Sequence, residues 1–156
     1  MKDRSPSARV RDLAARDAHI EVTGTVDDIR PYMDRAAVYA VPLRIGGGTR
    51  IKIFEAMAEG KAVVSTTIGA EGLPVTNEQN IVIADKPEDF AARVVTLLRD
   101  ASKRHTLGDA ARKLVEENYS WKSVARQFAE VLARVAHRPL ESPAAATPDE
   151  VRSSTR

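Results

Sequence analysis

The sequence contains no cysteine, few aromatic residues and no large excess of either charge. The absence of cysteine excludes a disulfide framework, thiol chemistry and Cys-ligated zinc, and it fits a reducing compartment, so we expect a cytoplasmic location. The three histidines, His19, His105 and His137, have no metal-ligand spacing, so we expect no metal. Aromatic residues make up 4%, and the net charge is only +2 because cations alternate with acids. With little to stack on bases and no basic stripe, nucleic acid is not an expected partner.

Long apolar runs are also missing, and none approaches the roughly 18 residues that a membrane helix needs. The charged start, "MKDRSPSARVRD", is not a secretory signal. What remains is 156 residues of ordinary globular composition, 43% hydrophobic and 29% charged. From Pro139 the chain is rich in Pro, Ser and Ala without periodicity. We therefore expect one domain over residues 1–138 and a disordered tail over 139–156.

Apolar runs that favour strands alternate with segments of helical periodicity. The runs at 37–42, 62–66 and 80–85 are continuous, as strands buried on both faces of a parallel sheet should be, and 19–24 predicts a shorter strand. Helical spacing predicts helices over 8–17, 27–36, 49–59, 87–100, 103–119 and 121–137. This order predicts an α/β fold, a Rossmann-like parallel sheet with flanking helices.

Local signals mark several helix ends. Asp27, Ser102 and Ser120 are expected N-caps, Pro87 fits a first helical turn, and Gly60 fits a left-handed helix stop. Within the last helix an apolar stripe recurs at helical spacing, and we expect it to pack in the core. Its members are Trp121, Val124, Phe128, Val131 and Leu132.

The most informative segment is "PLRIGGGTRIKIFEAMAEG", residues 42–60, where a strand runs into three glycines and then a helix. Gly46, Gly47 and Gly48 let backbone approach a ligand, and Thr49 is the expected N-cap. The helix N-terminus favours an anion such as phosphate, and an anion would also offset the cations of its first turn, Arg50 and Lys52. The alternative is a flexible strand-to-helix turn, because the string matches neither the Walker pattern nor GxGxxG.

Glu55 carries the second half of this signal. On the helix it falls between Ile51 and Ala58, on the face expected to pack against the sheet, where a carboxylate needs a partner. Two interpretations remain open: a buried ion pair, or a hydrogen-bond acceptor for ligand hydroxyls.

With these residues in view, residues 22–73, "VTGTVDDIRPYMDRAAVYAVPLRIGGGTRIKIFEAMAEGKAVVSTTIGAEGL", resemble a known family. They are similar to the C-terminal, donor-binding domain of retaining glycosyltransferases of the GT-B fold, family 4 (group 1), and to the subgroup with the signature GGGTRxKxxEAMA. The resemblance runs from about residue 8 to about residue 135. It implies an incomplete GT-B C-terminal domain whose partner is a nucleotide-diphosphate sugar, with no cofactor.

The resemblance also implies roles for particular residues. Glu55 would hold the ribose hydroxyls, and the backbone of the glycine loop would meet the diphosphate and sugar. The segment "GAEGL" would lie near the donor, and Arg44 is a further candidate at the strand end. The expected substrate-binding residues are Arg44, Gly46, Gly47, Gly48, Thr49, Arg50, Glu55, Gly69, Ala70, Glu71 and Gly72. No catalytic residue is assigned.

The sequence departs from the family in two respects. Most members have an acid eight residues before the Glu that matches Glu55, and this chain has Gly47 there, so sugar recognition would fall to backbone groups or to Arg44 and Arg50. A complete member also begins with an acceptor domain and two further strands, so we expect an N-terminally truncated chain that is inactive alone. The whole enzyme would be able to associate peripherally with membranes. The alternatives are a non-catalytic nucleotide- or phosphate-binding module and a degenerate remnant.

Overall fold

The computed structural model describes residues 6–46, 48 and 50–136. The predicted tail and two residues of the glycine loop, Gly47 and Thr49, lie outside the described residues. The elements, in order, are α1 (Ala8–Arg16), α2 (Arg30–Arg35), β1 (Val38–Val41), α3 (Ile51–Ala58), β2 (Ala62–Ser65), β3 (Val82–Ile83), α4 (Pro87–Arg99), α5 (Ala101–Tyr119) and α6 (Trp121–Val135).

The three strands form one parallel sheet in the order β1-β2-β3. Val38 pairs with Ala62 and Val41 with Ser65, and β3 joins the other edge of β2 through the pair Val64 and Val82. Each connection between neighbouring strands contains a helix or a long loop, as parallel pairing requires. The predicted α/β fold with a parallel sheet and flanking helices is confirmed.

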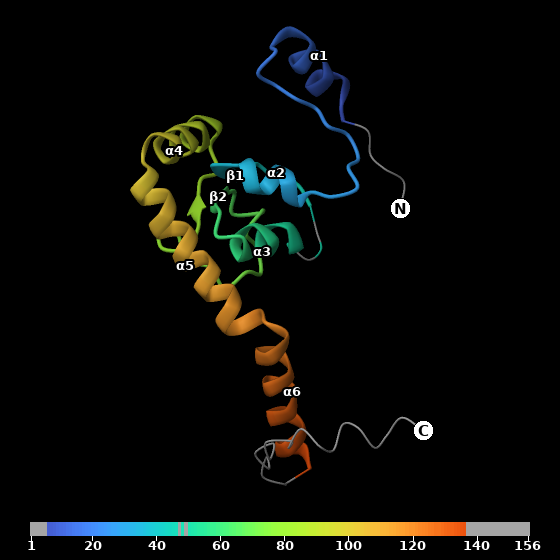
Figure 1. Ribbon diagram of the computed structural model, residues 1–156, viewed down its shortest axis with the longest axis vertical. Coiled ribbons are helices and arrows are strands. Elements are labelled where there is room, and N and C mark those ends of the chain that lie inside the picture. Colours follow the sequence, from blue (N-terminus) through green and yellow to red (C-terminus); the bar gives the residue numbers. More distant parts are fainter. Residues whose placement is uncertain (1–5, 47, 49, 137–156) are drawn as a thin grey trace, which may run out of the picture.

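The central strand β2 is buried on both faces, which explains its unbroken apolar run. On one face, Val63 belongs to a cluster with residues of α2, α3 and α5, among them Met33, Ile53, Met57 and Ala111. On the other face, Val64 packs with residues of β3, α4 and α5, namely Val82, Leu97 and Leu107. The helices therefore cover both sides of the sheet (Figure 1).

The end of α3 is fixed by two glycines. Gly60 follows the C-cap Glu59 with φ of 66°, and so it ends the helix in the left-handed conformation predicted from the sequence. Gly108, inside α5, is buried against this turn, and a Cβ at Gly108 would collide with the carbonyl oxygen of Gly60. The glycine that lowers the helix propensity of α5 therefore permits its close approach to α3.

Of the predicted helix starts that the structure describes, two are confirmed and two are wrong. Pro87 opens α4, and the Ser120 side chain accepts a hydrogen bond from the Ser123 amide at the start of α6. At α5, however, Asp100 rather than Ser102 is the N-cap, because its carboxylate accepts from the Lys103 amide. At α2 the N-cap is Ile29 rather than Asp27, and the short helix lacks a side-chain cap.

The strand predicted over 19–24 is absent. Among the described residues this segment has no neighbouring strand to pair with, and its apolar side chains Ile20 and Val22 are exposed. An alternating pattern is only a local preference, and a strand also needs a partner for its backbone hydrogen bonds.

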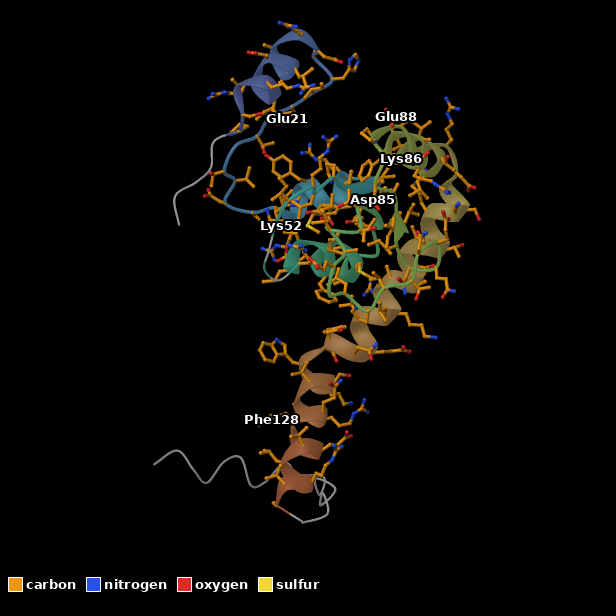
Figure 2. The ribbon with its side chains drawn as sticks, turned by 180° about the vertical axis from the view of Figure 1, so that it is seen from behind. Glu21, Lys52, Asp85, Lys86, Glu88 and Phe128 are labelled. Atoms are coloured by element: carbon orange, nitrogen blue, oxygen red, sulfur yellow. The ribbon has the colours of Figure 1, made fainter. Side chains whose placement is uncertain are left out.

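Both α1 and α6 extend from the body of the molecule (Figure 1). None of the residues of α1 is buried, and Ser123 is the only buried residue that α6 contributes. The apolar stripe on α6, expected in the core, is exposed: Trp121 by 91% and Phe128 by 64%. Figure 2 places Phe128 on α6, apart from the body of the molecule. The pattern predicted the helix correctly and its burial wrongly.

Within the described ranges, no helix is both long and apolar enough to cross a membrane.

Candidate functional site

The three segments that follow the strands meet at the carboxyl edge of the sheet. They line a cavity of about 430 Å³, whose walls are Leu43, Arg44, Thr66, Thr67, Ile68, Asp85 and Pro87. A smaller hollow of about 170 Å³ adjoins it and shares Arg44, Thr66, Asp85 and Pro87. Ligands of parallel α/β sheets bind at this edge. Another cavity, of about 180 Å³, lies at the opposite edge, near Gly60 and His105, and we do not place the site there.

Side-chain hydrogen bonds tie the three strand ends together. The Thr66 hydroxyl donates to the carbonyl of Leu43, which joins the segment after β2 to the segment after β1. The Asp85 carboxylate accepts from the Thr67 amide at 2.8 Å and from the Thr67 hydroxyl at 2.7 Å. Figure 2 shows Asp85 within the body, below Lys86 and Glu88 at the start of α4. The hydrogen bonds from Thr67 lower the pKa of Asp85.

The turn after β2, residues 67–72, packs closely against the sheet. The Gly69 amide donates to Thr66 Oγ1 at 2.9 Å. A Cβ at Gly69 would collide with the Ser65 hydroxyl and lie 3.3 Å from the carbonyl oxygen of Val41. Gly69 and Ala70 are therefore buried and positioned by the strand ends, whereas Glu71 and Gly72 are exposed.

The described part of the glycine loop lies open beside this turn. Gly46 and Gly48 are exposed, and Gly48 has φ of 95° with open space around its missing Cβ. Arg44 is also exposed and lines the cavity. The predicted N-cap Thr49 lies outside the described residues, and Arg50 occupies the N-cap position without a side-chain cap.

The Arg50 side chain is folded inward rather than toward solvent. Its exposed fraction is 9%, and Nη2 donates to the carbonyl of Ile68 at 2.7 Å and to that of Gly46 at 3.2 Å. A carboxylate oxygen of Glu71 lies 3.7 Å from the same nitrogen. The Nε of Arg50 is buried and has no hydrogen-bond partner among the described residues. Arg50 thus contacts both loops of the candidate site.

Glu55 is exposed, so the expectation that it packs against the sheet is wrong. The buried face of α3 consists of Ile53, Ala56 and Met57, and at 100° per residue Glu55 points to nearly the opposite side. Burial chiefly, and the charge of Glu55 secondarily, raise the pKa of Tyr39. Glu55 therefore lies within electrostatic range of β1, on the side of α3 that is open to solvent.

Sequence reasoning missed the polar residues that organise the site: Thr66, Thr67 and Asp85. Each lies within two residues of the end of a strand, and that position at a carboxyl edge was an available signal. Among the described residues, no group of His, Asp and Glu could hold a metal ion. The cavity therefore offers hydroxyls, backbone amides, one carboxylate and one exposed guanidinium to a ligand.

Comparison with known proteins extends this description. Residues 2–100 match the family described as "Glycosyl transferases group 1". The chain belongs to this family.

Two relatives in this family are similar to the chain over part of their length. The chain is 26% identical over 94 residues to an uncharacterised glycosyltransferase of Methanocaldococcus jannaschii, covering 59% of this chain and 24% of the relative. It is 30% identical over 126 residues to a GDP-mannose-dependent alpha-(1-6)-phosphatidylinositol monomannoside mannosyltransferase of Mycobacterium tuberculosis, covering 73% of this chain and 32% of the relative. The chain thus spans about a quarter to a third of these relatives.

Solved structures support the fold. Sucrose-phosphate synthase from Thermosynechococcus elongatus superposes with a TM-score of 0.67 and 21% identity, over 83% of this chain and 34% of that one. The C-terminal domain of a glycosyl transferase group 1 family protein from Francisella tularensis gives a TM-score of 0.60 and 17% identity, over 74% and 66%. At these identities the likeness concerns the fold alone.

Proposed function

We propose that this chain binds the nucleotide-diphosphate sugar of a retaining glycosyltransferase at the carboxyl edge of its sheet. The observation that carries the proposal is the meeting of the glycine loop after β1 with the turn after β2, at the start of α3, in a member of the glycosyl transferases group 1 family. Backbone amides at a helix start attract a diphosphate, and glycines let it approach.

Glu55, on the exposed side of α3, is the proposed acceptor for the ribose hydroxyls. Its exposure supports the role, because a carboxylate on the open side of α3 can meet a ligand without the cost of permanent burial. Sugar recognition is proposed to fall to Arg44 and to backbone groups. Arg44 is exposed and lines the cavity, whereas the guanidinium of Arg50 is already engaged by two carbonyls.

The described residues would supply the donor side of the reaction. In transfer, the bond between the anomeric carbon and the diphosphate oxygen breaks with its electron pair going to the diphosphate. The acceptor oxygen bonds the same face of that carbon, and its proton passes to the departing diphosphate or to solvent. Positioned donors that stabilise the departing diphosphate would be the main contribution of this chain.

The first experiment is a calorimetric titration of the chain with GDP-mannose and with UDP-glucose. GDP-mannose is chosen because a relative is named as dependent on it. Glu55→Gln should weaken binding of the preferred nucleotide sugar about 10- to 100-fold, since hydrogen bonds to a charged acceptor contribute about 1.5–3 kcal/mol. Glu59→Gln is the matched control, because Glu59 is exposed at the far end of the same helix.

A second titration isolates the ribose contact. The parent chain should bind a nucleoside diphosphate more tightly than its 2′,3′-dideoxy analogue, and Glu55→Gln should abolish the difference. Saturable binding with no effect of Glu55→Gln would remove the ribose role and leave donor binding standing. Absence of saturable binding with either nucleotide sugar would overturn the proposed function.

A further inference from the structure

We propose that Arg50 is a positioning residue that fixes the loop after β1 against the turn after β2, and that it acts through backbone carbonyls rather than by contacting the ligand. The inference rests on the proposed donor site, because both segments carry the contacts proposed there. Its physical basis is one nitrogen, Nη2, which donates to the Gly46 carbonyl and to the Ile68 carbonyl.

The geometry suits arginine specifically. Gly46 and Ile68 belong to segments that follow different strands, and the 2.7 Å bond spans 18 residues of sequence. The two protons of Nη2 diverge in the plane of the guanidinium, so each can serve one carbonyl. A lysine ammonium is a compact charge on a flexible stem and does not reproduce this planar fork. The bridge therefore depends on shape as well as on charge.

Burying the Arg50 guanidinium to make these two hydrogen bonds costs the fold free energy. The Arg50 side chain is 9% exposed, and within the described part of the chain its one carboxylate neighbour, Glu71, lies 3.7 Å away and is itself 74% exposed. Its buried Nε has no hydrogen-bond partner among the described residues. Removing one partner of a buried ion pair is costly when it leaves the other charge buried, but Glu71 is exposed and stays hydrated when Arg50 is replaced by an apolar side chain of similar length. An arginine at this position is thus better explained by the alignment of the two loops than by stability.

By holding the two loops together, Arg50 also fixes the turn 67–72, whose backbone carries proposed ligand contacts. Ile68 accepts from Arg50, and its carbonyl also lies 3.4 Å from the Glu71 amide. The Gly69 and Ala70 amides donate to Thr66 in the same turn. Loss of the Arg50 bridge should therefore free the turn as a unit while the sheet beneath it stays intact.

The test combines amide hydrogen exchange of the unliganded chain with the titrations above. Arg50→Met should keep the melting temperature of the parent or raise it. The amides of Gly69, Ala70 and Glu71 should exchange at least about tenfold faster, and those of α4 and α5 should be unchanged. Arg50→Lys should show the same local loss. Arg112→Met, which removes an exposed arginine of α5, is the matched control and should leave the turn unchanged.

The variants in which the turn exchanges faster should also bind GDP and UDP more weakly. We expect a tenfold or greater loss of affinity in Arg50→Met and Arg50→Lys. Unchanged exchange in the turn, or faster exchange throughout α4 and α5, would overturn the positioning role. Full protection and affinity in Arg50→Lys would also overturn it, because charge alone would then suffice. Exchange is measured without ligand, so it tests the role of Arg50 even if the chain binds neither nucleotide. Absence of nucleotide binding would overturn the proposed function alone.

Discussion

The carboxylate of Asp85 accepts two hydrogen bonds from Thr67, one from the amide at 2.8 Å and one from the hydroxyl at 2.7 Å. The two residues follow neighbouring strands, β3 and β2, so the pair joins two strand ends across the candidate site. Four predictions about stability follow from this contact and from the packing around it.

The first prediction concerns pH. The bonds from Thr67 lower the pKa of Asp85 in the folded chain, while an aspartate in the unfolded chain titrates near about 3.9. The resulting stabilisation is complete above the unfolded pKa and is lost as the pH falls through the folded pKa. Asp85→Asn should therefore lower the melting temperature near neutral pH, and the difference from the parent should shrink as the pH falls below the unfolded pKa of about 3.9 and through the lower folded pKa.

Thermal melts over a pH series measure this difference. Asp109→Asn is the control, because Asp109 is exposed on α5, away from the strand ends. A melting-temperature difference for Asp85→Asn that stays constant down to the acid limit would show that the carboxylate does not carry the effect.

The second prediction concerns Gly69. A methyl group there would collide with the Ser65 hydroxyl and press on the Val41 carbonyl, so Gly69→Ala should destabilise the fold by about 1–3 kcal/mol. The double variant Ser65→Ala/Gly69→Ala removes the nearest obstacle and should recover part of the loss. Urea denaturation of the parent, both single variants and the double variant measures the coupling. Purely additive effects would contradict the proposed collision.

The third prediction concerns Gly108. In an exposed helix interior, glycine to alanine stabilises by up to about 1 kcal/mol. Here the new Cβ would collide with the Gly60 carbonyl, so Gly108→Ala should lower the free energy of unfolding by about 1–3 kcal/mol. Asp109→Ala, at the next and exposed position, should have little effect or a slightly stabilising one. Equal effects of the two substitutions in denaturant unfolding would refute the close approach.

The fourth prediction separates exposed from buried apolar residues. Phe128→Ser should change the unfolding free energy of this chain by no more than about 0.5 kcal/mol, since Phe128 is 64% exposed on α6. Leu97→Ala should cost about 2–5 kcal/mol, because Leu97 is fully buried on α4. Denaturation midpoints for the two variants give the comparison, and a large loss in Phe128→Ser would mean that α6 packs against the body.

Much of the fold could be predicted from local patterns. The apolar runs marked the three strands, Pro87 marked the start of α4, and Ser120 marked the start of α6. These signals are read from adjacent residues, so no knowledge of distant contacts is needed. The segment 19–24 failed because a strand also requires a partner, and the described structure provides none there.

The location of the candidate site could be predicted from the sequence, but the contacts between its residues could not. The glycine loop pointed to the carboxyl edge of the sheet, where a cavity of about 430 Å³ lies. The rotation of α3 was misjudged, and this placed Glu55 on the wrong face. The links from Asp85 to Thr67 and from Arg50 to Ile68 each span 18 residues, and no periodic pattern encodes such contacts.

The contact between Gly60 and Gly108 has a consequence for how this sequence can change over time. A side chain at position 108 becomes acceptable only if the backbone at position 60 moves away, and a different residue at position 60 must adopt φ near 66° or reshape the same turn. The two sites, 48 positions apart in the chain, should therefore covary among homologues: lineages should keep glycine at both or replace both together.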